Sequence, residues 1–210
     1  MQTRTYGNLF KTASSLIGAG GELDAGEQSQ LSNFINRRFQ QAFDESSLWP
    51  RYIVIGEERD LTADTTIVPY AESGKDTIGD FISISNKKPL SRVSVTEFPF
   101  YVDANGANII SFNSSTDNKA FVTYKKQFTP FTVNADYYNS TVEVPGEFFN
   151  FIAHAAYADF LRVQNRQEQA MAEEQMAQGY LFQEMEKIDL RSNNNSIGKK
   201  ISTYVNRQSR

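Results

Sequence analysis

The sequence predicts an α+β protein in which a helical region is interrupted by a strand-rich region. Before about residue 46, apolar residues recur at spacings of three and four, as on one face of a helix. Between residues 52 and 144 they alternate with polar residues, as in strands. The helical spacing then returns over 145–188. We therefore expect an antiparallel bundle of two N-terminal and two C-terminal helices with an inserted antiparallel β domain.

The expected division of the chain follows these changes of period. Residues 1–50 form the N-terminal helices of the bundle, 51–144 the β insert domain, and 145–188 the C-terminal helices. Residues 189–210 form an extended C-terminal tail that carries five basic groups and one acidic group. The tail is polar and rich in Asn and Ser, so alone it is expected to be disordered.

The N-terminal helices are predicted from their stripes and their ends. The first carries apolar residues from Tyr6 to Ile17 and ends at glycines that begin with Gly18. The second is expected over about 25–46, since Asp24 and Glu27 have the spacing of a capping box. Its apolar face consists of Leu31, Phe34, Ile35, Arg38, Phe39 and Ala42.

The β region is expected to hold about five to eight strands. "RYIVIGEERDL" indicates two short strands around Gly56, while "TIGDFISIS" and "NKAFVTYKKQF" each indicate one more. The Asn105-Gly106 pair lies between apolar alternations and predicts a hairpin.

The C-terminal helices begin at Pro145, which suits the first turn of a helix because that position needs no N–H. A break near Asn165 separates two helical runs, which we interpret as a helical hairpin.

Composition excludes several classes of function. The chain has no cysteine and one histidine, so thiolate chemistry, zinc–thiolate sites and multi-histidine metal sites are excluded. No apolar run is long enough to span a membrane, and the N-terminus lacks the features of a signal peptide. The net charge of −4 argues against tight sequence-specific DNA binding. We expect no catalytic, cofactor-binding or metal-binding residues and no enzyme activity.

Ionisable residues that resemble sites have simpler structural explanations. His154 lies in the middle of a helix, where a lone histidine is more often structural than a general base. The acidic run Glu57, Glu58 and Asp60 could bind a cation or act on glycosides, but we favour a solvated strand edge. The turn at Asp103 resembles part of a calcium loop, but the downstream Glu is missing.

Other features suggest contacts with partners. The pairs Lys87-Lys88 and Lys125-Lys126 could touch a nucleic-acid backbone or a partner carboxylate, or be scattered surface lysines. The aromatic segment "KQFTPFTVNADYYNS" could stack sugars, anchor an interface or pack between the two modules. We interpret Trp49 and Pro50 as a structural pin: Pro50 helps to end the helix, and Trp49 wedges between bundle and β insert.

The tail is the region most typical of a partner-binding segment. Its candidate residues are Ile197, Lys199, Lys200, Ile201, Tyr204 and Arg207. Ile197, Ile201 and Tyr204 follow helical spacing, and a segment of this type often becomes ordered against another chain. An unordered, solubilising end is the alternative.

"LSNFINRRFQQAFDESSLWPRY" and "VEVPGEFFNFIAHAAYADFLRVQNRQEQAMAEEQMAQGYLFQEMEKI" together resemble the head-to-tail adaptor (connector) proteins of tailed bacteriophages, of the tail tubular protein A-like type. The resemblance covers about 25–50 and 143–190, and the β insert matches in position and length. It implies a non-enzymatic virion protein, assembled in the host cytoplasm, that forms a ring of usually twelve copies at the head–tail junction. Its partners would be other copies, the portal protein and a downstream tail or nozzle protein.

In such a ring, genomic DNA would pass through the lumen during ejection without being read, and the tail at 189–210 would dock on the portal or a neighbour. A ring needs head-to-tail contacts between copies. The alternative function is a carbohydrate- or receptor-binding β module on a helical stalk. An enzymatic function would depend on the carboxylate clusters alone.

Overall fold

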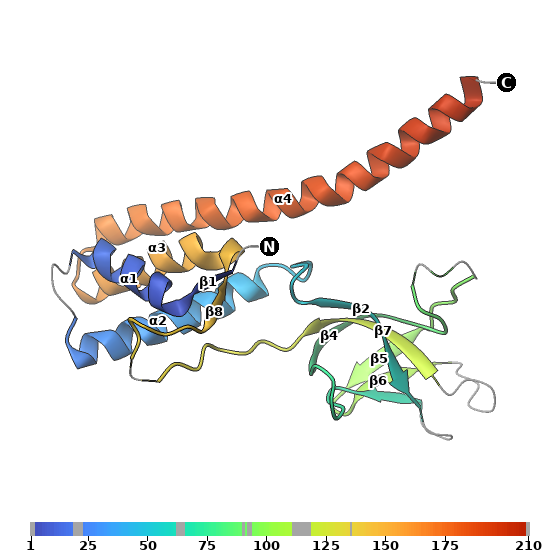
Figure 1. The fold of residues 1–210 in the computed structure, drawn as a ribbon, viewed down its shortest axis with the longest axis horizontal. Helices are drawn as coiled ribbons and strands as arrows, with labels where there is room; N and C mark the ends of the chain where they lie inside the picture. Colours follow the sequence, from blue (N-terminus) through green and yellow to red (C-terminus); the bar gives the residue numbers. More distant parts are fainter. Residues whose placement is uncertain are drawn as a thin grey trace. The chain divides into compact units, whose positions relative to one another are not determined.

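The computed structural model describes residues 3–18, 23–61, 66–89, 91, 94–110, 119–134 and 136–208, with only the backbone described for residue 3 and for 189–208. Within them the chain is mixed α+β, with four helices and antiparallel sheets, which confirms the predicted class (Figure 1). The chain divides into a helical unit, Met1–Ser46 with Pro130–Arg210, and a β unit, Ser47–Thr129.

Three helices of the helical unit surround the fourth (Figure 1). They are α1 (Tyr6–Ile17), α2 (Ala25–Asp44) and α4 (Gln167–Gln208), and each packs against α3 (Gly146–Val163). α3 is accordingly apolar on most sides, with Phe148, Phe151 and Ile152 fully buried. The alanines of α3 allow neighbouring helices to approach closely. Ala155 of α3 and Ala170 of α4 accordingly have no exposed surface.

The helix ends follow the predicted local signals. The side chain of Asp24 accepts a hydrogen bond from the backbone N–H of Glu27 at 2.8 Å, and Glu27 accepts from the Asp24 N–H in return, so the capping box is confirmed. Gly18 ends α1 in the left-handed conformation. Asn165 has a φ of 60° between α3 and α4, which confirms the predicted break. Pro145 is the N-cap of α3.

Two features of the helical unit lie outside the local patterns. Strand β1 (Thr3–Thr5) pairs antiparallel with β8 (Glu143–Pro145), which joins the two ends of the helical sequence. Residues 130–142, expected within the β insert, belong to the helical unit. Gly7 makes this possible, because a Cβ there would lie 2.6 Å from the carbonyl oxygen of Tyr138.

The aromatic segment is packed onto the helices by its own rings. Phe131 stacks on Phe39 of α2 at a ring separation of 4.3 Å, and Tyr138 contacts Phe10 of α1 edge-on at 4.9 Å. The side chain of Asn36 forms two hydrogen bonds with the backbone of Phe131: it donates to the carbonyl and accepts from the N–H. These contacts place Phe131 and Tyr138 against the helices of the helical unit, so packing explains these two rings.

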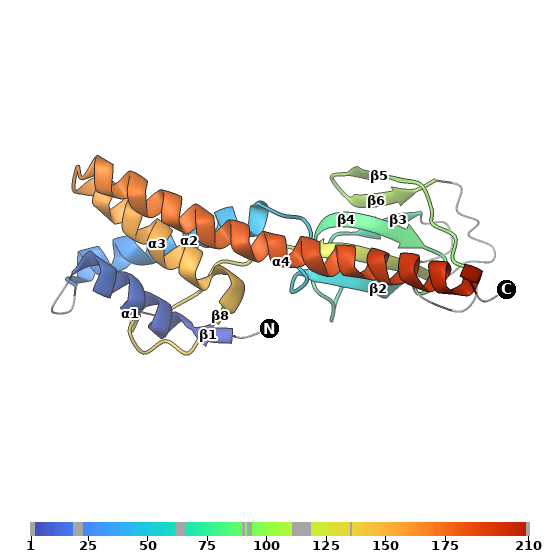
Figure 2. The ribbon, with the colours of Figure 1, turned by 90° about the horizontal axis from the view of Figure 1, so that it is seen from above.

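Two three-stranded antiparallel sheets form the β unit (Figure 2). One has the order β2-β7-β4 (Ile53–Asp60, Lys119–Lys126, Ile78–Ser85), and the other β3-β6-β5 (Ile67–Pro69, Gly106–Ile109, Phe100–Asp103). Both sheets contribute to one apolar core, which includes Val68, Ile84, Ala107 and Val122.

The strand "RYIVIGEERDL" differs from its prediction. It is one strand, β2, whose register with β7 shifts between Val54 and Glu57, rather than two strands. Gly56 at this bulge has a φ of 60°, and a Cβ there would meet the ring of Pro89 at 2.3 Å. The predicted hairpin is present, but its two loop residues are Ala104 and Asn105, and Gly106 begins β6.

The backbone does not show the separate extended tail expected from residue 189. Instead α4 continues as a single helix to Gln208. The segment contains no proline, and its apolar residues already have helical spacing, so nothing in its sequence forces the helix to end.

Candidate functional site

Helix α4 is the element that carries the predicted partner-binding residues. It has 42 residues, against 18 in α3. At about 1.5 Å per residue, the two helices are about 63 Å and about 27 Å long, so α3 can cover only part of α4. α4 therefore extends past α3 (Figure 1). We name the last part of α4, residues 189–208, the helical arm.

The predicted contact residues themselves lie beyond the described side chains. They are Ile197, Lys199, Lys200, Ile201, Tyr204 and Arg207, all within the backbone range of α4. Their role in binding a partner stays a prediction.

The part of α4 next to α3 is held by an ion cluster with a buried centre, Arg38 and Asp159. We name it the helical arginine cluster, and its members are Arg37, Arg38, Asp159, Arg162 and Glu174. Arg38 of α2 donates to both carboxylate oxygens of Asp159 in α3 at 2.7 and 2.6 Å. It also donates to both carboxylate oxygens of Glu174 in α4 at 2.9 and 2.7 Å. A fifth hydrogen bond, to Gln41, engages the last of the five N–H donors. One side chain thus ties three helices together.

Burial lowers the pKa of Arg38, but its hydrogen bonds and its attraction to Asp159 and Glu174 outweigh this, so the pKa is raised. Burial likewise raises the pKa of Asp159, and the neighbouring Arg38 and Arg37 reverse this and hold it below its usual range. Arg38 and Asp159 are therefore both charged at neutral pH. Asp159 also pairs with Arg37 at 2.6 Å and with Arg162 at 2.8 Å. These ion pairs hold helices together, which is a structural role.

The sequence contains a signal for this cluster. Arg38 lies on the apolar face of its helix, and Asp159 lies among the apolar residues of α3. A buried charge needs a partner, so two opposite charges on apolar faces indicate a pair. Glu174 could not be assigned in this way, because α4 is rich in glutamate.

His154 has a partner on the neighbouring helix. Its Nδ1 lies 2.7 Å from a carboxylate oxygen of Glu173 in α4, and its ring packs 5.2 Å from that of Tyr180. These contacts support the structural interpretation, in which His154 helps to fix α4 on α3.

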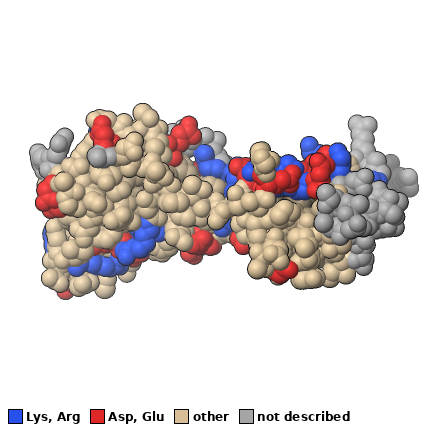
Figure 3. All heavy atoms as spheres, turned by 90° about the horizontal axis from the view of Figure 1, so that it is seen from below, with Lys and Arg blue, Asp and Glu red and all other residues tan. Residues whose placement is uncertain are grey.

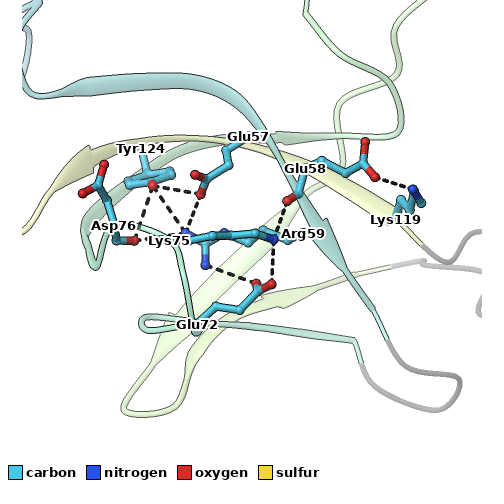
Figure 4. A network of polar contacts seen from close by, with 8 residues as sticks. All are labelled: Glu57, Glu58, Arg59, Glu72, Lys75, Asp76, Lys119 and Tyr124. Atoms are coloured by element: carbon cyan, nitrogen blue, oxygen red, sulfur yellow. Dashed lines mark hydrogen bonds and ion pairs between the residues drawn. The ribbon is translucent and has the colours of Figure 1, made fainter.

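One residue of the acidic run, Glu57, belongs to a second cluster, shown in Figure 4. Arg59 of β2 has no exposed surface and pairs with Glu57 at 2.6 Å and with Glu72 at 3.2 Å. It also donates to the backbone carbonyl of Asp76 at 3.1 Å and to the hydroxyl of Tyr124 at 3.3 Å. We name this group the β-unit arginine cluster.

The β-unit arginine cluster holds the loop between β3 and β4 against the sheet. Lys75 in that loop donates to a carboxylate oxygen of Glu72 and to the backbone carbonyl of Glu58, both at 2.6 Å (Figure 4). Burial, followed by the hydrogen bond to Glu57, raises the pKa of Tyr124 to about 12, so its hydroxyl stays protonated and donates. The Nε of Arg59 is buried without a hydrogen-bond partner.

Two of the remaining charged candidates, Glu58 and Lys126, have local ion-pair partners. Glu58 pairs with Lys119 across the sheet, on the face opposite Glu57, as the strand alternation predicts. Lys126 pairs with Asp76 at 2.6 Å, and Lys125 is buried. Figure 3 accordingly shows both signs of charge side by side on the β unit. Such a mixed surface is not the basic face that a nucleic-acid backbone attracts.

The turn at Asp103 is explained by hydrogen bonds. One carboxylate oxygen accepts from the N–H groups of Asn105 and Gly106 at 2.7 and 3.2 Å, and the other accepts from the side chain of Asn108. Among the described residues, no group of three or more His, Asp or Glu side chains could hold a metal ion.

Trp49 is buried, with 2% of its surface exposed, whereas Pro50 is exposed. The backbone carbonyl of Trp49 accepts from the N–H of Tyr52 at 3.0 Å, in the turn before β2. Its role as a pin between the two modules stays a prediction.

Within the described residues, no helix is long and apolar enough to cross a bilayer. Comparison with models of known protein families and with curated protein sequences found no match.

Proposed function

We propose that this chain is a structural subunit of the head-to-tail adaptor of a tailed bacteriophage. The starting point is the resemblance of residues 25–50 and 143–190 to such adaptors. The structural observation that carries the proposal is α4, a 42-residue helix supported by an 18-residue helix. Most helical stability in proteins comes from packing of an apolar face, so the part of α4 that α3 does not cover is best explained by a partner protein.

In this proposal the subunits form a ring, with twelve copies as in similar proteins, between the portal and the tail. The helical unit makes the lateral contacts, the arm docks on the portal or a neighbour, and the β unit faces the next tail or nozzle protein. Genomic DNA passes through the lumen during ejection. A net charge of −4 suits a channel through which DNA slides without being held.

A non-enzymatic role is supported by the way the described charges are used. The helical arginine cluster fastens helices, the β-unit arginine cluster fastens a loop, and His154 pairs with Glu173. Catalytic groups would need to be available to a substrate in a suitable geometry.

Truncation before Asp189 tests the docking role of the arm. The full chain is expected to bind the portal protein encoded with it, and the truncated chain is expected to lose this binding while its thermal unfolding is retained. Lys11→Ala, an exposed change on α1, is the control and should bind as the unmodified chain does. Unchanged portal binding by the truncated chain would refute the docking role.

Particle imaging of the chain, alone and mixed with that portal protein, tests the ring. Rings in either sample support the adaptor.

The alternative is a carbohydrate- or receptor-binding β module, and it is favoured by one observation: Tyr101, Val102 and Ile110 are 58%, 49% and 46% exposed around the β5–β6 hairpin. A stable monomer that binds glycans and ignores the portal would support this alternative over the adaptor.

A further inference from the structure

The β5–β6 hairpin contains the only Asn-Gly pair of the sequence, Asn105-Gly106. Asn105 is the second of the two loop residues, and both loop residues are exposed. When glycine follows asparagine, its main-chain nitrogen can reach the carbon of the asparagine side-chain amide easily, because glycine has no Cβ to obstruct the approach. The hairpin therefore holds the groups needed for a spontaneous covalent change in an exposed loop.

The fold requires the glycine at position 106. Gly106 has a φ of 143°, and a Cβ there would lie 2.1 Å from the carbonyl oxygen of Val68 in β3. At this point β6 pairs with β3, with Gly106 opposite Pro69. Because a side chain at position 106 would collide with the neighbouring strand, the pairing of β3 with β6 keeps an unhindered nitrogen directly after Asn105.

The side-chain amide of Asn105 is not held by the turn. The carboxylate of Asp103 accepts from the main-chain N–H groups of Asn105 and Gly106 at 2.7 and 3.2 Å. Within the described part of the chain, the side-chain amide of Asn105 has no hydrogen-bond partner. The bond to Asp103 does not block an attack by the Gly106 nitrogen, because the N–H lies in the peptide plane and the reacting electrons lie above it.

The charge of Asp103 keeps this arrangement in place. Its pKa is held below the usual range, first by the hydrogen bond from the Asn105 N–H and then by that from the Asn108 side chain. The carboxylate is therefore ionised at neutral pH and continues to accept from the main chain of the loop.

Two other asparagines show the opposite arrangement. Asn139 is exposed and is followed by a serine, but its side-chain amide donates to both carboxylate oxygens of Asp136 at 3.1 and 3.2 Å. Asn108 is buried, and its side-chain amide donates to Asp103 at 2.9 Å. Since a carboxylate holds each of these amides, the structure distinguishes Asn105 from both.

We propose that Asn105 is a modification site at which the side-chain amide is lost by attack of the Gly106 nitrogen. This nitrogen forms a bond to the Cγ of Asn105, and the bond from Cγ to the side-chain nitrogen breaks. The proton of the Gly106 N–H passes through water to the departing group, which leaves as ammonia. Water then opens the cyclic imide, at the side-chain carbonyl to give aspartate or at the main-chain carbonyl to give isoaspartate.

The isoaspartate product changes the hairpin itself, because it adds a carbon to the main chain of a two-residue loop. Loop length fixes the register of a hairpin, which here pairs Val102 with Ala107 and Phe100 with Ile109. Ala107 and Ile109 belong to the apolar core of the β unit, so this product destabilises that unit. The modification depends on the hairpin alone and holds whether or not the chain is an adaptor.

Ageing of the purified full chain in warm, mildly alkaline buffer tests the site. Isoelectric focusing is expected to show a more acidic band that grows with time. Fragmentation mass spectrometry should place the change of mass at Asn105, with Asn108 and Asn139 unchanged, and part of the product should resist a protease that cuts before aspartate. Asn105→Gln is the control, because its longer side chain disfavours the cyclic imide, so it should form no acidic band at this position. The aged natural chain should also unfold at a lower urea concentration than aged Asn105→Gln.

Two outcomes would overturn the inference. Loss of the amide from the chain in urea, with Asn105 intact in the folded chain, would show that the turn protects it. Loss at Asn139 as fast as at Asn105 would show that a held and an unheld amide do not differ. Loss at Asn105 without a change in urea unfolding would support the modification site and contradict the effect on the β5–β6 register.

Discussion

Among the described residues, each unit of this protein buries an arginine, and the two are used differently. Arg38 in the helical unit is 7% exposed, and all five of its N–H donors are bonded, to partners on three helices. Arg59 in the β unit has no exposed surface, yet its Nε lacks a partner. Its ion-pair partners, Glu57 and Glu72, are nearby in sequence and remain 24% and 30% exposed.

The two arginines stabilise different parts of the fold: distant helices in one unit and a single loop in the other. The partners of Arg38 are 121 and 136 residues away, so its cluster holds together parts of the chain that no local rule connects. The partners of Arg59 fix one loop on one sheet. Because the carboxylates around Arg59 reach water and those of the helical cluster reach it less, losing one charge should cost more in the helical unit.

The largest expected effect is that of Asp159→Ala. It leaves Arg38 buried without its main partner, and breaking a buried pair in this way costs about 3–5 kcal/mol. Urea unfolding measures the loss. Lys187→Ala removes an exposed pair with Glu184 on α4 and should change stability by less than about 0.5 kcal/mol. Equal effects of the two variants would contradict the role given to the helical cluster.

A smaller effect is expected from Arg59→Met. It removes a buried donor that already lacks a partner, and Glu57 and Glu72 can regain water, so we expect a loss of about 1–3 kcal/mol. The same unfolding measurement applies. A loss as large as that of Asp159→Ala would erase the distinction between the two arginines.

The smallest effect is the one imposed by acid below about pH 4. The pKa of Asp159 is held below its usual range, so its contribution is fully present above the unfolded value of about 4 and is lost as the pH falls through the folded value. Unfolding free energies measured from neutral pH down to acid should therefore fall less steeply for Asp159→Asn than for the natural chain. The pKa of Glu72 is also lowered, so some acid sensitivity remains in the variant. Parallel curves would argue against an ionised, paired Asp159.

Much of the candidate site, helix α4, could be predicted from the sequence, but the inward direction of two of its glutamates could not. Pattern and spacing predict that α4 is a helix with one apolar stripe that includes Leu181. Phe182 follows Leu181 by about 100° around the helix, which places it off that stripe, and it is exposed. That Glu173 and Glu174 point inward depends on His154 and Arg38, which lie on other helices. Because Glu173 and Glu174 pair with other helices, the exposed residues of α4 between Gln169 and Gln183 are all uncharged.

Helix caps, helix ends and strands could be predicted from the sequence, because they depend only on neighbouring residues. Asp24 and Glu27 cap α2, Gly18 ends α1, Asn165 breaks the C-terminal helices, and an alternating pattern produces the strands of the β unit. Each depends on contacts within a few residues, where backbone geometry and hydrogen bonding give few choices.

The contacts between distant segments could not be predicted from the sequence and are seen in the folded chain. β1 pairs with β8, the aromatic segment around Phe131 joins the helices, and Arg38 finds Asp159. The physical reason is that burial and charge pairing are non-local: a buried arginine or phenylalanine signals that it needs a partner, but several partners along the chain would satisfy it equally. Packing the whole chain selects one of them.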